Sequence, residues 1–236
     1  MREPTEFHLP ADSDEAIRIQ RALAGNVRLD PLPRPPRLVA GADLAFLPGR
    51  DIGVAAVVVV DLRSGQTVDE VIITRPVPFP YRTGLLSFRE IPAVLDCLIG
   101  LHHQPDIIIC DGQGIAHPRR IGLASHLGVV LNRPTIGCAK RCLIGDYIEP
   151  GPEKGATTPL LHQGLEIGRV VRTRTAVKPV FVSPGHRVTI EDAVAVVLAV
   201  AGGYRVPEPV RRAHLAAEQE KRRLLSPWSR RDWRGH

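Results

Sequence analysis

The chain has 236 residues, of which 44% are hydrophobic and 24% are charged, which is ordinary usage for a globular protein able to bury a core without disulfide staples. That length favours one compact domain spanning residues 1–236. The formal net charge of +6 favours a polyanionic partner such as nucleic acid, although an incidentally basic protein would show the same surplus.

The first third of the chain predicts an N-terminal segment followed by a β-meander. Residues 1–37 read as a helix at 13–23 and a proline-rich link. Strands are expected at 38–46, 52–62 and 67–74. Because short turns join these strands, they predict an antiparallel meander.

The remaining chain alternates helices with short strands. Helices are expected at 88–102, 120–127, 189–201 and 208–224, and strands at 106–111, 134–138, 165–172 and 179–182. The final residues, 225–236, form a basic tail that is either disordered or adds nonspecific phosphate contacts. Three strands, a helix, a strand, a helix and a strand predict an α/β fold, with a mixed sheet flanked by helices in the ribonuclease H-like order.

Two aspartates stand where an apolar strand would normally carry no charge. Asp43 lies in the middle of the first predicted strand, on the face with the smaller neighbours. Asp111 ends a buried apolar run beside a glycine-rich turn, which is a usual place for a ligand or catalyst. Because an unpaired buried charge is costly, each aspartate either binds a metal or has a structural role, as an Arg partner or an Asx-turn would provide.

Glu90 is a third candidate, and its structural alternative is strong. Ser87 and Glu90 have the spacing of a capping box, and Pro92 also marks a helix start. On its own this pattern favours a cap. Together with Asp43 and Asp111, however, Glu90 can complete a carboxylate cluster. Such hard oxygen ligands suit Mg²⁺, which activates water and stabilises charge on a leaving oxygen.

Other polar side chains are less specific signals. Lys140 follows a predicted strand and can hold a phosphate, although a solvated surface lysine fits equally well. His117 and His214 can act as acid, base or ligand, but lone histidines are more often structural. Cys138 and Cys142 lack a second ligand pair, so no zinc site is predicted there. Reduced thiols, the absence of a signal peptide and short apolar runs favour a cytoplasmic protein without a membrane partner.

Residues 111–128, which read DGQGIAHPRRIGLASHLG, resemble the signature block of endonuclease V, the repair nuclease that acts at deaminated purines. Other stretches agree with that family, namely 39–43, 80–90, 137–140, 182–186 and 204–214. The resemblance covers almost the whole chain apart from the last dozen residues. It implies a ribonuclease H-like fold and a DNA repair endonuclease that nicks the second phosphodiester bond 3′ to deoxyinosine and leaves the base in place.

The resemblance also implies residue roles. Asp43 and Asp111 would bind Mg²⁺, for which Mn²⁺ would substitute, and Glu90 would complete the cluster. His214 would sit beside the metal and Lys140 near the scissile phosphate. Metal-activated water would attack after the lesion base is turned out of the stack.

Lesion recognition would depend on a wedge and a pocket. Tyr81 resembles the family's wedge, which fills the gap left by the turned-out nucleotide. The base would sit near Gly84, Leu86, Gly112, Gly114, Gly122 and Leu143. The family's wedge loop commonly reads Pro-Tyr-x-Pro-Gly, whereas this chain has Thr83 in place of the second proline. That change removes a fixed φ and is expected to loosen the loop.

The expected partner is DNA containing deaminated bases, bound by a monomer. One alternative is an inosine- or structure-directed ribonuclease on the same core, because no residue settles DNA against RNA. A second is a nucleic-acid binder that has lost its metal. The intact trio of Asp43, Glu90 and Asp111 argues against the latter.

Overall fold

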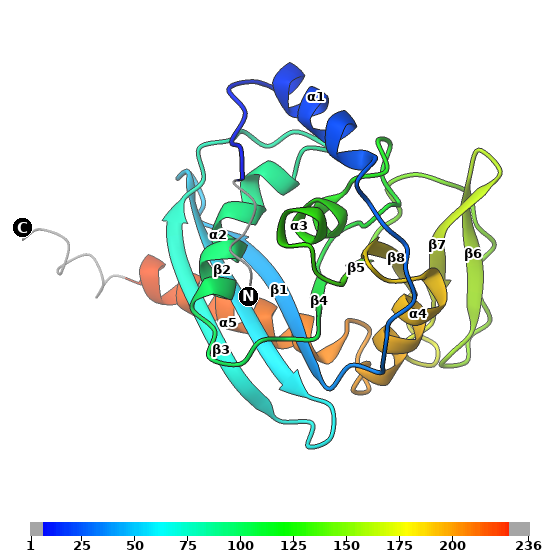
Figure 1. Ribbon diagram of the computed structural model, residues 1–236. Helices are drawn as coiled ribbons and strands as arrows, with labels where there is room; N and C mark the ends of the chain where they lie inside the picture. The colour runs from blue at the N-terminus through cyan, green and yellow to red at the C-terminus, as the bar shows by residue number, and fades with distance from the viewer. Residues whose placement is uncertain (1–6, 227–236) are drawn as a thin grey trace, which may run out of the picture.

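The computed structural model describes residues 7–226, so the predicted basic tail lies almost entirely outside the described residues. Eight strands form one sheet in the order β3-β2-β1-β4-β5-β8-β7-β6 (Figure 1). The strands are β1 (Leu38–Phe46), β2 (Ile52–Asp61), β3 (Thr67–Pro76), β4 (Ile107–Cys110), β5 (Thr135–Ala139), β6 (Thr157–His162), β7 (Leu165–Val171) and β8 (Val180–His186). The helices are α1 (Ser13–Ala24), α2 (Ser87–Ile99), α3 (Leu123–Leu131), α4 (Ile190–Ala199) and α5 (Glu208–Leu225).

The sheet is mixed, which confirms the predicted fold class. Strands β1, β2 and β3 pair antiparallel through short turns. Strand β4 pairs parallel with both β1 and β5, since helices α2 and α3 carry the chain back across the sheet. Strands β5, β8, β7 and β6 then continue antiparallel to the other edge.

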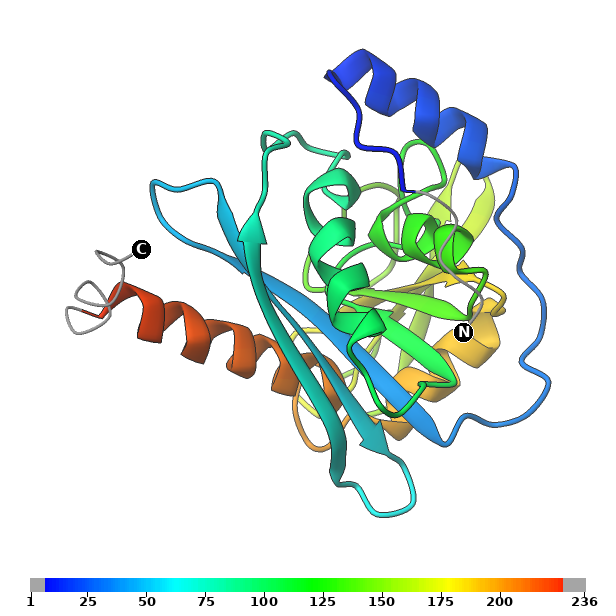
Figure 2. The same ribbon diagram turned by 60° about the vertical axis from the view of Figure 1, so that its left-hand side comes forward.

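Helices cover both faces of the sheet. Helices α2 and α3 pack on one face against the apolar cluster that includes Ala40, Val57 and Ile108. Helices α4 and α5 cover the opposite face, as Figure 2 shows for α5. Helix α1 lies outside α2 and α3, where its Ala16 packs with the buried ring of Phe88. No helix within residues 7–226 has the length and apolar character that a membrane span requires.

Several predicted boundaries were wrong for local reasons. Helix α3 begins at Leu123 and not at 120, because Arg120 has φ +58° and therefore lies outside helical geometry. Strand β8 extends beyond the predicted end at 182, because a register shift opposite Thr135 accommodates Pro184, which has no N–H to donate. Strand β6 was not predicted at all.

The capping box proposed at Ser87 and Glu90 was also wrong. Leu86 precedes the helix without a side-chain cap, and Ser87 Oγ instead bonds Nδ1 of the buried His126 at 3.0 Å. The structural alternative for Glu90 therefore has no support in the geometry of the helix start.

Candidate active site

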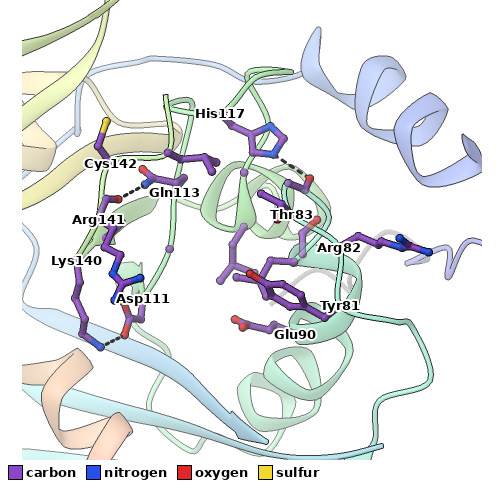
Figure 3. A pocket seen from close by; sticks show the side chains of 18 of the residues that line it. Tyr81, Arg82, Thr83, Glu90, Asp111, Gln113, His117, Lys140, Arg141 and Cys142 are labelled. Atoms are coloured by element: carbon purple, nitrogen blue, oxygen red, sulfur yellow. Dashed lines mark hydrogen bonds and ion pairs between the residues drawn. The ribbon is translucent and has the colours of Figure 1, made fainter. Parts of the chain in front are cut away.

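A cavity of about 540 Å³ opens where β1 and β4 approach the start of α2. Its walls come from Asp43 within β1, the segment that follows β4, the loop at 80–86, the start of α2 and the loop that follows β5. Figure 3 shows Tyr81 and Glu90 on one wall, facing Asp111 and Lys140 on the other. The predicted residues that line it are Asp43, Tyr81, Gly84, Leu86, Glu90, Asp111, Gly112, Gly122, Lys140 and Leu143.

Two predicted residues lie outside that lining. Gly114 is absent from the lining, and its N–H donates to Ser183 Oγ at 2.8 Å. His214 reaches the site from α5 by bonding Asp43.

The parallel pairing of β1 with β4 brings two of the carboxylates together. Ala42 is paired with Cys110, the last residue of β4, so Asp43 and Asp111 each come directly after this pair. The N–H of Asp111 donates to the Ala42 carbonyl at 3.2 Å, which holds this register to the end of β4. Glu90 lies on α2, which packs on the face of the sheet opposite to α4 and α5.

Burial and repulsion between carboxylates raise the pKa values of Glu90 and Asp111. Glu90 is only 8% exposed, and burial followed by the charges of Asp43 and Asp111 holds its pKa well above the usual range. Burial and Asp43 likewise raise the pKa of Asp111, against the lowering effect of Lys140. The ionised form of this carboxylate cluster is therefore unfavourable unless positive charge lies beside it.

Each aspartate has one basic neighbour. Lys140 Nζ donates to Asp111 Oδ2 (Figure 3), and although burial alone would lower the pKa of this lysine, the carboxylates of Asp111 and then Asp43 raise it. On the opposite side, His214 Nδ1 lies 2.7 Å from Asp43 Oδ2. Four of the five predicted catalytic residues thus line one cavity, and the fifth, His214, contacts that site through Asp43.

The donor set fits Mg²⁺ better than a softer metal. Asp43, Glu90 and Asp111 all present carboxylate oxygens toward one cavity and repel one another electrostatically. Within residues 7–226, no three acidic, histidine or cysteine side chains already stand in a coordinating arrangement. Because Lys140 and His214 currently hold oxygens of the two aspartates, the carboxylates would rearrange on binding a cation.

Sequence reasoning missed two polar residues at this site and favoured a structural role for a third. Gln20 of α1 and Gln113 both line the cavity, and no local pattern distinguishes either from an ordinary polar residue. His117, for which a structural role was favoured, also lines the cavity while bonding the Gly84 carbonyl at 2.9 Å. The one sequence signal for a place in the site was membership of the 111–128 block, which contains Gln113 and His117 but not Gln20.

The meander and the following parallel strands form a ribonuclease H-like fold, and an acidic cavity beside β1 and β4 is typical of the nucleases of that class. Within that class, the chain belongs to the endonuclease V family, since the Endonuclease V family model matches residues 21–215. Enzymes of this family are deoxyribonuclease V hydrolases that cleave DNA near deoxyinosine lesions.

Individual relatives agree with this assignment. The chain is 48% identical to the endonuclease V of Geotalea uraniireducens over 223 residues, covering 94% of each chain. It is 50% identical to that of Trichormus variabilis over 203 residues, covering 86% of this chain and 92% of the relative. The crystal structure of the Streptomyces avermitilis endonuclease V matches with a TM-score of 0.88 at 45% identity, covering 94% of this chain and 98% of that one.

A more distant relative has been solved with nucleic acid. The endonuclease V of Ciona intestinalis, in complex with a 24mer DNA containing an inosine followed by a ribo-adenosine, matches with a TM-score of 0.78 at 26% identity. That match covers 89% of this chain and 98% of the Ciona chain.

Proposed function

We propose that this protein nicks DNA at the second phosphodiester bond 3′ to deoxyinosine, after turning the lesion base out of the stack. One observation carries the proposal: a single cavity joins the carboxylates to the loop of Tyr81 and Gly84. The turned-out base would thus bind in one part of the cavity, and the phosphate to be cut would bind in the adjoining part.

The chemistry at the carboxylate end would depend on a divalent cation. Asp43, Asp111 and Glu90 would hold Mg²⁺, with Mn²⁺ able to substitute, and the ion would supply an activated water and charge stabilisation for the leaving oxygen. His214 orients the Asp43 carboxylate through its 2.7 Å contact. The ammonium of Lys140, which now pairs with Asp111, is placed to hold a phosphate oxygen.

The other end of the cavity suits a turned-out base. Gly84, Gly112 and Gly122 let backbone amides and carbonyls approach a base edge closely, while Leu86 and Leu143 offer apolar surface. Hypoxanthine lacks the exocyclic amines of adenine and guanine, so a tight pocket rejects both. Gly114 would act one layer behind, as a support of the pocket wall.

Tyr81 is suited to the role of wedge because 69% of its surface is exposed at the loop tip. An aromatic ring inserted into the duplex offsets part of the stacking lost when a nucleotide turns out, and a mispaired base such as hypoxanthine costs less to extrude. The partner proposed for this chain is therefore DNA containing deaminated bases.

A gel assay tests the proposal directly. End-labelled duplexes with and without one deoxyinosine, and the matching inosine RNA, are incubated with Mg²⁺. The expected product is a nick one nucleotide beyond the lesion on its 3′ side, in the inosine DNA only. Cleavage confined to RNA would favour the ribonuclease alternative, and equal cutting of unmodified DNA would refute lesion recognition.

The matched variants are Asp43→Ala and Asp51→Ala. Loss of the Asp43 carboxylate should abolish cleavage yet leave binding of the inosine duplex largely intact, because the cation serves chemistry more than docking. Asp51 is an exposed acid in the turn after β1 and should be replaceable without effect. A near wild-type cleavage rate for Asp43→Ala would refute the metal assignment.

A further inference from the structure

The loop that carries Tyr81 contains a tight turn without the usual proline. The N–H of Leu85 donates to the Arg82 carbonyl at 3.0 Å, and Gly84, the third residue of the turn, has φ +78°. A turn with positive φ at that position favours proline in the second place, which here is Thr83. The stiffness of this turn must therefore come from outside the loop.

Three side chains from other segments converge on one carbonyl of this turn. The Gly84 oxygen accepts from Gln20 Nε2 at 3.0 Å, from His117 Nε2 at 2.9 Å and from Arg119 Nη2 at 2.8 Å. A carbonyl oxygen has two lone pairs, so three donors, one of them cationic, surround it fully. We call Gln20, His117 and Arg119 the Gly84 clamp.

The histidine of the clamp is fixed as a donor. The N–H of Arg119 donates to His117 Nδ1 at 3.2 Å, so Nδ1 has no proton and Nε2 carries the hydrogen that reaches Gly84. Burial lowers the pKa of His117 to about 4, which keeps the ring neutral near pH 7. Figure 3 shows His117 bonded toward the loop beside Thr83.

Gln20 holds the clamp together. Its side chain is 1% exposed, and its Oε1 accepts from Arg119 Nε at 2.6 Å while its Nε2 donates to Gly84. The same amide therefore orients the guanidinium that bonds Gly84 and bonds Gly84 itself. It comes from α1, 64 residues before Gly84, so the N-terminal helix forms part of the cavity wall.

Apolar contacts hold the two ends of the loop and leave its tip free. Phe79 and Leu85 are buried against Ala16 of α1 and Phe88 of α2. Tyr81, between them, is largely exposed. The clamp at Gly84 and the apolar contacts thus form a rigid base beneath a projecting aromatic side chain.

We propose that Gln20 is a positioning residue for lesion selection: through the Gly84 carbonyl, with His117 and Arg119, it sets how Tyr81 enters the duplex. It touches no reacting atom. The inference rests on the proposed function, because it requires Tyr81 to act as the wedge. Helix α1 would then contribute to lesion recognition as well as packing against α2 and α3.

The test variant is Gln20→Met, which keeps the length and helix propensity of the side chain but removes its hydrogen bonds to Gly84, Ile121 and Arg119. Cleavage of a deoxyinosine duplex should fall about tenfold, as loss of a buried hydrogen-bonded contact at a positioned site predicts. Cleavage of the same inosine strand without its complement should fall less than about twofold, because no duplex has to be opened. A merely structural role would lower both rates together.

Two further variants separate positioning from packing. Ile17→Ala removes apolar contact from the same helix without touching the clamp, and it should leave the duplex to single-strand ratio unchanged. Gln20→Glu keeps the acceptor for Arg119 but removes the donor to Gly84, and it should shift the ratio in the same direction as Gln20→Met. The Glu variant also serves if the Met variant does not fold.

A binding readout completes the test. In EDTA, 2-aminopurine placed beside the deoxyinosine reports unstacking by its fluorescence, and saturating Gln20→Met should give a smaller increase than wild type. If wild type prefers inosine duplex while Gln20→Met keeps both the wild-type ratio and the wild-type signal, the inference is overturned and the proposed function stands. If wild type shows no preference for inosine, both are overturned.

Discussion

At the scale of single residues, the site contains charged side chains whose burial disfavours folding. Glu90 is buried beside two other carboxylates, and its pKa is raised by burial and by their charges. Lys140 and His214 offset part of this repulsion through Asp111 and Asp43. Such local conflict between stability and charge is expected where a cation or phosphate is to be bound.

Replacing Glu90 tests this conflict between stability and function. Because the folded protein resists ionisation of Glu90 while the unfolded chain loses the proton near the ordinary pKa of about 4.3, wild-type stability should fall as pH rises above that value. Glu90→Gln removes this fall. In EDTA it should melt at a higher temperature than wild type at pH 8, with the gap closing toward pH 4.

The same variant should lose cleavage in Mg²⁺ by at least about a hundredfold, since it removes a proposed ligand of the catalytic cation. Glu153→Gln, an exposed acid outside the cavity lining, is the control for both melting and cleavage. A Glu90→Gln protein that melts below wild type at pH 8 would contradict the repulsion described here.

Tyr81 makes a separate prediction at the residue scale. Tyr81→Ala should reduce the preference for inosine over unmodified duplex by about tenfold, since base–aromatic stacking contributes about 1–3 kcal/mol. Tyr81→Phe should keep most of that preference, because the ring and not the hydroxyl fills the gap. The measurement is the ratio of cleavage rates on the two duplexes, and an unchanged ratio for the alanine variant would show that Tyr81 is not the wedge.

At the scale of elements, the site depends on how closely α5 approaches β1. A Cβ added to Gly41 would lie 2.1 Å from the backbone carbon of Pro209, in the first turn of α5. Only glycine allows this approach, and His214 reaches Asp43 because α5 lies this close. The small residue on the strand therefore lets His214 on the helix contact Asp43.

Gly41→Ala should accordingly disturb both stability and catalysis. Overpacking against backbone should cost about 1–3 kcal/mol of unfolding free energy, measured by denaturant titration. Cleavage in Mg²⁺ should fall with it, because α5 must move away from Asp43. Gly25→Ala, where the added Cβ meets nothing within 4 Å, should change neither quantity. Full activity in Gly41→Ala would show that the contact between α5 and β1 does not position His214.

At the scale of the whole molecule, the net charge of +6 bears on affinity more than on selection. Phosphate contacts are the same for damaged and undamaged DNA and release counterions on binding. Selection of the lesion is instead proposed to depend on the cavity and the Tyr81 loop. Salt should therefore act on the two properties differently.

Raising the salt concentration should weaken binding of inosine and unmodified duplexes in parallel and leave their affinity ratio nearly constant. Arg141→Ala, which removes an exposed cation at the cavity, should make the log–log salt slope shallower by about one unit. Arg174→Ala, an exposed arginine outside the cavity lining, should leave the slope unchanged. A fall in inosine preference with salt would contradict this division.

Local patterns predicted most of the fold. The meander, the buried strand before Asp111 and the helices were all expected from alternation, turns and helix signals. Strand β6 escaped prediction because it is the sheet edge and carries Pro159, which is tolerated only where a donor is dispensable. The start of α3 was misplaced because nothing local reveals the positive φ of Arg120.

The sequence by itself determined the chemistry that is available: the three carboxylates, the lysine and histidine, and the long motif that places the chain in its family. Only the tertiary structure decided which of them meet. Lys140 pairs with Asp111 across 29 residues, and His214 pairs with Asp43 across 171. Gln20 became part of the site in the same way, since periodicity reports only neighbours within an element and contacts between distant segments follow from packing.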